Sequence, residues 1–208
     1  MKRVLAVLML VALILCAGCG GKTETTEEKL KQQLPELLEN ELEIEGIYRG
    51  GGLTTENAAY TPDENGQCFV RVTDEDYPTV AVLKEKTEQV FTPAYAEENL
   101  YSYAFSGDWP RYKDIDGALH MDVNQGGGLD REWNTAEIQI LEEKEDGVLV
   151  QVEYMTYGSR YLAEMTLVPQ EDGTYRIDTL HMESKGNKER SPAGVYPAGL
   201  LVYAHQYN

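Results

Sequence analysis

A series of strand-like runs separated by short turns fills the second half of the chain and restricts the fold more than any other feature. Asp116-Gly117 joins Tyr112–Ile115 to Ala118–Val123 and is a strong hairpin signal, because such two-residue turns need positive φ angles. The longer candidate strands that follow are Thr135–Glu142, Val148–Tyr157, Arg160–Val168 and Thr174–His181. We therefore expect an antiparallel meander.

Helical patterns precede these strands. Leucines at helical spacing predict a helix over about Glu27–Leu42, which Pro35 interrupts. Thr79 is a candidate N-cap for a second helix, and Thr92 followed by Pro93 starts a third. Helices first and a meander second predict one α+β domain over residues 29–182. In this domain the N-terminal helices pack on a curved antiparallel sheet, in a cystatin-like arrangement.

The first residues have the features of a bacterial lipoprotein signal peptide. Two cations precede an uncharged apolar run from Val4 to Leu15, which Cys-Ala-Gly-Cys19 follows. The run is shorter than the ~20 residues that span a bilayer. Ala-Gly before a cysteine resembles the lipobox, which implies that residues 1–18 are removed and that Cys19 carries a lipid. An uncleaved anchor and a plain signal peptide are the alternatives.

Two further segments are predicted to lie outside the domain. Residues 19–28 are small, polar and acidic, which is typical of a flexible tether. Residues 183–208 contain many Gly, Pro and polar residues, and we expect a partly disordered tail there. Together with a lipid on Cys19, the tether would hold the domain at the extracytoplasmic face of the cell membrane.

The charge and the cysteines exclude some functions. A formal charge of −18 argues against binding to nucleic acid or to anionic lipid headgroups. A basic protein partner fits better, although acidity also serves solubility alone. Once Cys19 is acylated and Cys16 is removed, Cys68 has no cysteine with which to form an intramolecular disulfide.

No catalytic residue, metal site or cofactor site is predicted. Cys68 lies in the strand-like run Gln67–Val72, where nothing stabilises a thiolate, and a buried structural cysteine is the better interpretation. The histidines lack zinc-ligand spacing, and Asp114–Gly117 lacks the third oxygen ligand before the glycine and the closing glutamate of a calcium loop. The glycine runs at 50–52 and 126–128 match no phosphate-binding pattern. We therefore predict that the protein is not an enzyme.

With these sites excluded, the remaining candidate is a surface that binds a protein partner. Aromatic side chains near loops are natural anchors in interfaces, and a cation at a loop tip stands out in an acidic protein. The candidate contact residues are Trp109, Tyr112, Trp133, Tyr157 and Arg160. Packing in the core or at a sheet edge is the alternative for the aromatic residues, and a solvated hairpin is the alternative for Arg160.

The order of turn and packing residues is similar to that of a known family. The motifs are Leu83 with Val90-Phe91-Thr92, then Asp116-Gly117-Ala118-Leu119, then the second glycine run with Trp133 and Ala136, and then Asp172-Gly173-Thr174-Tyr175-Arg176-Ile177-Asp178. Over residues 67–178 this order resembles the IseA family. Its members are secreted inhibitors of DL-endopeptidases, the cysteine enzymes that cut peptidoglycan stem peptides.

The resemblance implies an inhibitor that docks on a cell-wall cysteine endopeptidase and obstructs the catalytic cleft with a loop between strands. A lipid on Cys19 would confine this inhibition to the wall near the membrane. A second hypothesis is a non-enzymatic lipoprotein that binds a small molecule or a peptide in a cleft of its curved sheet.

Overall fold

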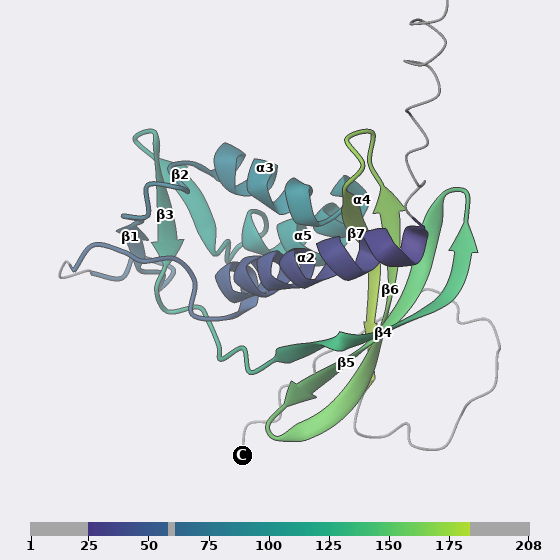
Figure 1. The fold of residues 1–208 in the computed structure, drawn as a ribbon. Coiled ribbons are helices and arrows are strands. Elements are labelled where there is room, and N and C mark those ends of the chain that lie inside the picture. The colour runs from purple at the N-terminus through teal and green to yellow at the C-terminus, as the bar shows by residue number, and fades with distance from the viewer. Residues whose placement is uncertain (1–24, 58–60, 184–208) are drawn as a thin grey trace, which may run out of the picture.

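The computed structural model describes residues 25–57 and 61–183 (Figure 1). These residues form an α+β fold, as predicted, with helices and two antiparallel sheets. The predicted signal peptide, Cys19 and all of the predicted tail except Glu183 lie outside the described residues. No helix in the described ranges is long and apolar enough to cross a membrane.

Helix α2 (Thr26–Arg49) is the longest element and connects the two halves of the fold. It begins with a capping box, in which Thr25 accepts a hydrogen bond from the backbone of Glu28 while the Glu28 carboxylate bonds the backbone of Thr25. The predicted boundary at residues 28 and 29 is therefore too late. The predicted interruption at Pro35 is also wrong. Buried leucines on both sides of Pro35 pack on the core and stabilise the helix across the missing hydrogen bond.

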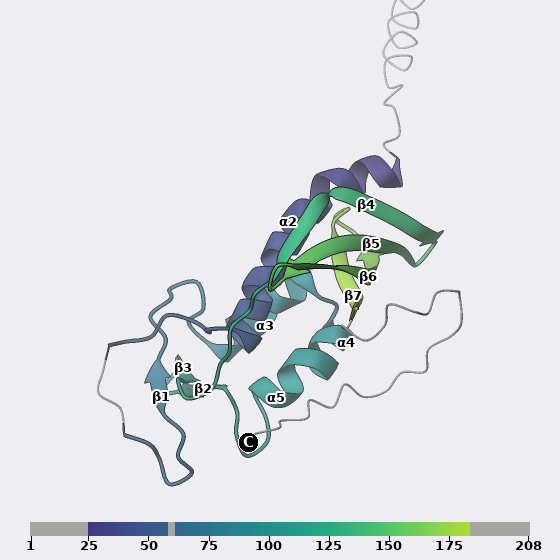
Figure 2. The ribbon, with the colours of Figure 1, turned by 90° about the horizontal axis from the view of Figure 1, so that it is seen from below.

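The four-stranded sheet is the predicted meander. Its strands follow one another in the order β4 (Glu132–Lys144), β5 (Gly147–Thr156), β6 (Ser159–Pro169) and β7 (Tyr175–Met182). Buried positions alternate along β5, where Val148, Val150 and Val152 face the helices. Figures 1 and 2 show that the sheet is strongly curved and that α2 crosses its inner side.

A second sheet corrects the expectation of a single meander. The Asp116-Gly117 hairpin forms as predicted, between β2 (Tyr112–Ile115) and β3 (Ala118–Asp122). The free edge of β3 pairs with β1 (Phe69–Arg71) instead of with β4, giving the order β1-β3-β2. Because β1 takes this edge, the chain after β3 leaves the small sheet before it starts β4. The two sheets lie at opposite ends of α2 (Figure 2).

Three short helical segments follow α3 (Val80–Val90) and complete the helical layer. They are α4 (Pro93–Ala96), η1 (Glu97–Tyr101) and α5 (Ser102–Ala104). Thr79 and Thr92 cap α3 and α4 as predicted, with proline at the first position of α4. One hydrophobic core joins these helices to α2 and to both sheets. The described residues therefore behave as one packing unit.

The two glycine runs explain how the small sheet is attached. Gly127 donates to the carbonyl oxygen of Gly50, and a Cβ on Gly126 would lie 3.0 Å from the same oxygen. Arg111 donates to the carbonyls of Tyr48 and Gly50 at the end of α2. The glycines are therefore needed for close backbone approach and for capping α2.

Candidate partner-binding site

The turn between β5 and β6 exposes an aromatic side chain in an unusual backbone conformation. Thr156 pairs with Ser159, so the loop consists of Tyr157 and Gly158. The turn thus starts one residue before Gly158-Ser159, the gap between the predicted strands Val148–Tyr157 and Arg160–Val168. The φ angles of Tyr157 and Gly158 are +48° and +70°, as in a type I′ turn. Tyr157 is 78% exposed, the largest exposed fraction among the large hydrophobic side chains of the described residues.

Asp130 holds this turn in place. Its Oδ2 atom accepts a hydrogen bond from the backbone N–H of Tyr157 at 2.6 Å. Arg160, opposite Met155 in the same hairpin, is 74% exposed and its Nε atom is 3.9 Å from the carboxylate of Glu153. A loose pair of this kind leaves the guanidinium available to another protein. The turn and the start of β6 therefore expose a phenol ring and a cation.

An aromatic row lies behind the turn. Trp133 in β4 is opposite Tyr154 in β5, which is opposite Tyr161 in β6. Their ring centroids are 5.6 and 5.5 Å apart. Aromatic pairs at this distance add rigidity to cross-strand packing. We call residues 130–133 and 153–161 the hairpin end.

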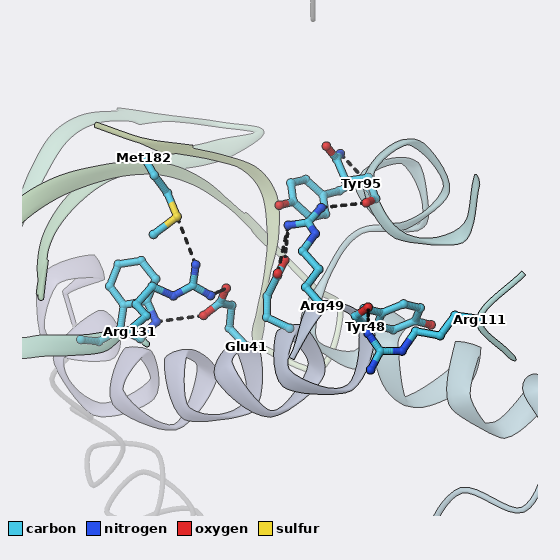
Figure 3. Close-up of polar contacts among 10 residues, drawn as sticks. Glu41, Tyr48, Arg49, Tyr95, Arg111, Arg131 and Met182 are labelled. Atoms are coloured by element: carbon cyan, nitrogen blue, oxygen red, sulfur yellow. Dashed lines mark hydrogen bonds and ion pairs between the residues drawn. The ribbon is translucent and has the colours of Figure 1, made fainter. Parts of the chain in front are cut away.

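A buried ion pair anchors the hairpin end to α2 (Figure 3). Arg131 and Glu41 form a salt bridge in which both side chains are almost fully buried, and the indole N–H of Trp133 donates to Glu41 at 2.9 Å. Burial raises the pKa of the Glu41 carboxyl to about 7, against the lowering effect of Arg131. Arg131 also contacts the sulfur of Met182 at the end of β7.

Neighbouring polar contacts continue along the same helix (Figure 3). Arg49 donates to both carboxylate oxygens of the buried Glu45 and to the backbone carbonyl of Asn99 in η1. These contacts fix η1 against α2. Glu45 is buried, whereas the Arg49 side chain is 44% exposed, so this pair lies at the boundary between the core and the solvent.

The structure brings together three of the five predicted contact residues. Trp133, Tyr157 and Arg160 all belong to the hairpin end, but Trp133 is partly buried and packs against the core. Trp109 is 56% exposed but lies in the loop before β2, where its carbonyl accepts from Gln125. Tyr112 is only 1% exposed, and its hydroxyl donates to the carbonyl of Ile47. The prediction of Tyr112 as a contact residue is therefore wrong, because this side chain packs in the core.

Three residues that support the hairpin end were not predicted from the sequence. Asp130 and Arg131 directly precede β4 but lie outside the predicted strand Thr135–Glu142. Glu41 lies among leucines on α2, and a carboxylate at a position expected to be buried was the available signal. The sequence alone does not indicate that Glu41 and Arg131, which are ninety positions apart, are in contact.

The described residues contain no cluster of His, Cys, Asp and Glu that could hold a metal ion. Cys68 is buried, as predicted, and its backbone N–H donates to Asp122. Comparisons of the chain with protein-family models, with curated proteins and with solved structures give no match.

Proposed function

We propose that this protein is a lipid-anchored inhibitor of a cell-wall DL-endopeptidase, held at the extracytoplasmic face of the membrane through Cys19. The order of sequence motifs supports the partner class, and the Ala-Gly-Cys19 pattern supports the anchor. The hairpin end is the surface that enters the partner's cleft. Inhibition needs no chemistry from the inhibitor, only a rigid projection that fills the cleft.

The choice of the hairpin end as the binding surface rests on the backbone conformation and exposure of Tyr157. Tyr157 occupies a left-handed backbone position where Asn, Asp or Gly is usual, and its ring remains in solvent. A bulky residue in this region is strained, and such strain gathers at functional sites. Folding alone does not account for tyrosine there, whereas an aromatic anchor for a partner does.

The test is peptidoglycan hydrolysis by a panel of DL-endopeptidases from the same organism. The inhibitor is the chain from residue 19 onward with Cys19→Ser, which keeps every described contact. We expect hydrolysis by at least one enzyme to stop at a near-stoichiometric dose, and Tyr157→Asn to relieve this inhibition. Full hydrolysis by every enzyme at tenfold excess of the chain would contradict the proposal.

The anchor has its own test. Growth of the organism with a clickable fatty acid should label the protein, and Cys19→Ala should abolish the label. Retention of the label in Cys19→Ala would contradict attachment at this residue, whatever the outcome of the inhibition assay.

A further inference from the structure

A hollow of about 260 Å³ lies between α2 and the turn that joins β6 to β7, far along the sheet from the hairpin end. Buried leucines line it, among them Leu30, Leu34 and Leu37 from α2 and Leu167 from β6. Its lining on α2 runs from Leu30 to Asn40, about 15 Å at 1.5 Å per residue. This is the length of roughly four residues of extended chain.

A partly open sheet edge borders this hollow. At the outer edge of β7, Ile177 forms a parallel bridge with Phe91, and Thr92 donates to the Ile177 carbonyl. Tyr175 is two residues earlier in the same strand, so its backbone groups face the same edge. No backbone group of the described residues pairs with them there. An extended segment in the hollow can therefore continue the edge by main-chain hydrogen bonds.

The fold uses only part of the hydrogen-bonding capacity of the polar lining. The Gln33 side chain donates to the carbonyl of Gly173, but its own oxygen is buried and has no partner in the described part of the chain. Asn40 and Gln89 form no side-chain hydrogen bond with a described residue. A buried acceptor without a partner indicates a missing donor, and the N–H of a peptide group is one.

Arg176 supplies the only positive charge in the lining of the hollow. Its guanidinium forms no ion pair or hydrogen bond with the described residues. It feels the charge of Asp172, but that carboxylate already accepts hydrogen bonds from the backbone and hydroxyl of Thr174. Glu36 also lines the hollow, so a ligand carboxylate has Arg176 as its one complementary charge there, and we place it on this residue.

We propose that this hollow binds a short free peptide of three or four residues in extended conformation. The peptide backbone pairs with Tyr175, an apolar side chain lies on the leucines, and the C-terminal carboxylate bonds Arg176. The site is separate from the hairpin end and does not depend on an endopeptidase partner.

The test is titration of the ¹⁵N-labelled chain from residue 19 onward, with Cys19→Ser, using acetyl-Ala-Leu-Ala with a free carboxylate as the probe. We expect shifts in the amide signals of Gly173, Thr174 and Tyr175, and none at Tyr157. The carboxamide form of the same peptide should bind at least about tenfold more weakly, because it cannot form an ion pair with Arg176.

A matched pair of variants separates this site from unspecific binding. Asn40 and Glu39 are adjacent, exposed residues of α2, but only Asn40 lines the hollow. Asn40→Trp should block the hollow and reduce affinity at least about tenfold, while Glu39→Trp should leave it unchanged. Absence of shifts up to 10 mM probe, equal affinity in the two variants, or equal affinity for the acid and the amide would overturn the proposal.

Discussion

Two of the tight hairpins in the described residues have nearly the same turn but different residues in it. In the small sheet, Asp116 and Gly117 have φ angles of +52° and +79°. In the large sheet, Tyr157 and Gly158 have +48° and +70°. Aspartate tolerates this region because its short side chain bonds the nearby backbone, whereas tyrosine has no such compensation.

This difference distinguishes a turn that only reverses the chain from a turn that also presents a side chain for binding. The Asp116 turn uses the residues that its geometry favours, and nothing beyond folding is needed to explain it. The Tyr157 turn departs from this preference and is held by Asp130, by an aromatic row and by a buried ion pair. A strained exposed ring with so much support behind it is consistent with selection for binding.

The largest expected effect on stability comes from removing the ion pair that anchors the hairpin end to α2. Arg131→Ala leaves Glu41 buried without its cation, so that the carboxyl stays buried only in its protonated form, and we expect a loss of about 3 kcal/mol in the free energy of unfolding, measured in urea. The double variant Glu41→Leu with Arg131→Met is the control, and it should recover most of this loss because no unpaired charge stays buried. A loss below about 1 kcal/mol in Arg131→Ala would show that the ion pair is not an anchor.

The same anchor predicts a pH dependence of the free energy of unfolding. The pKa of Glu41 is raised to about 7 in the folded protein, above its usual value of 4.5. The folded state therefore favours the protonated carboxyl. Its contribution to stability is complete below pH 4.5 and is lost as the pH rises through 7. Chemical unfolding between pH 4 and 8 should show this fall, and Glu41→Gln should remove it. Parallel curves for the two proteins would contradict the assignment.

The binding role of the Tyr157 turn is tested by giving it the residue that the geometry prefers. Tyr157→Asn should raise the free energy of unfolding by up to about 1 kcal/mol, because asparagine accepts positive φ. It should also weaken inhibition of the endopeptidase at least about thirtyfold, as loss of an aromatic anchor does. Asp116→Asn is the matched control and should change neither quantity. Unchanged inhibition by Tyr157→Asn would remove the hairpin end from the interface.

Local signals predicted the elements well, because caps, turns and alternation act over a few residues. Thr79, Thr92-Pro93 and Asp116-Gly117 all have the predicted roles. Contacts between distant segments were not predictable in this way. The pairing of β1 with β3 and the contact of Glu41 with Arg131 depend on how the elements are arranged. Tyr112 was misplaced for the same reason, because its strand alternation does not show which face is covered.

The converse test places a tyrosine in the Asp116 turn. Asp116→Tyr places an aromatic residue at φ +52° without the support that Tyr157 has, and we expect it to lower the free energy of unfolding by about 1 kcal/mol. Asp116→Asn provides the reference for loss of the aspartate alone. If Asp116→Tyr is as stable as the natural chain, tyrosine is acceptable in this turn type and the strain at Tyr157 carries no functional meaning.

The smallest expected effect concerns the support of the Tyr157 turn by Asp130. Asp130→Ala removes the acceptor for the Tyr157 N–H, and we expect a loss of roughly 0.5–1 kcal/mol in the free energy of unfolding, since the bond is exposed. Because the ring loses its fixed orientation, inhibition should weaken by about threefold to fivefold, less than with Tyr157→Asn. Glu137→Ala, which removes an exposed carboxylate of β4 outside the hairpin end, is the control. Equal effects of Asp130→Ala and Glu137→Ala would mean that the carboxylate of Asp130 contributes only charge. A selective effect of Asp130→Ala would instead show that the turn is preorganised for its partner, which distinguishes it from the Asp116 turn.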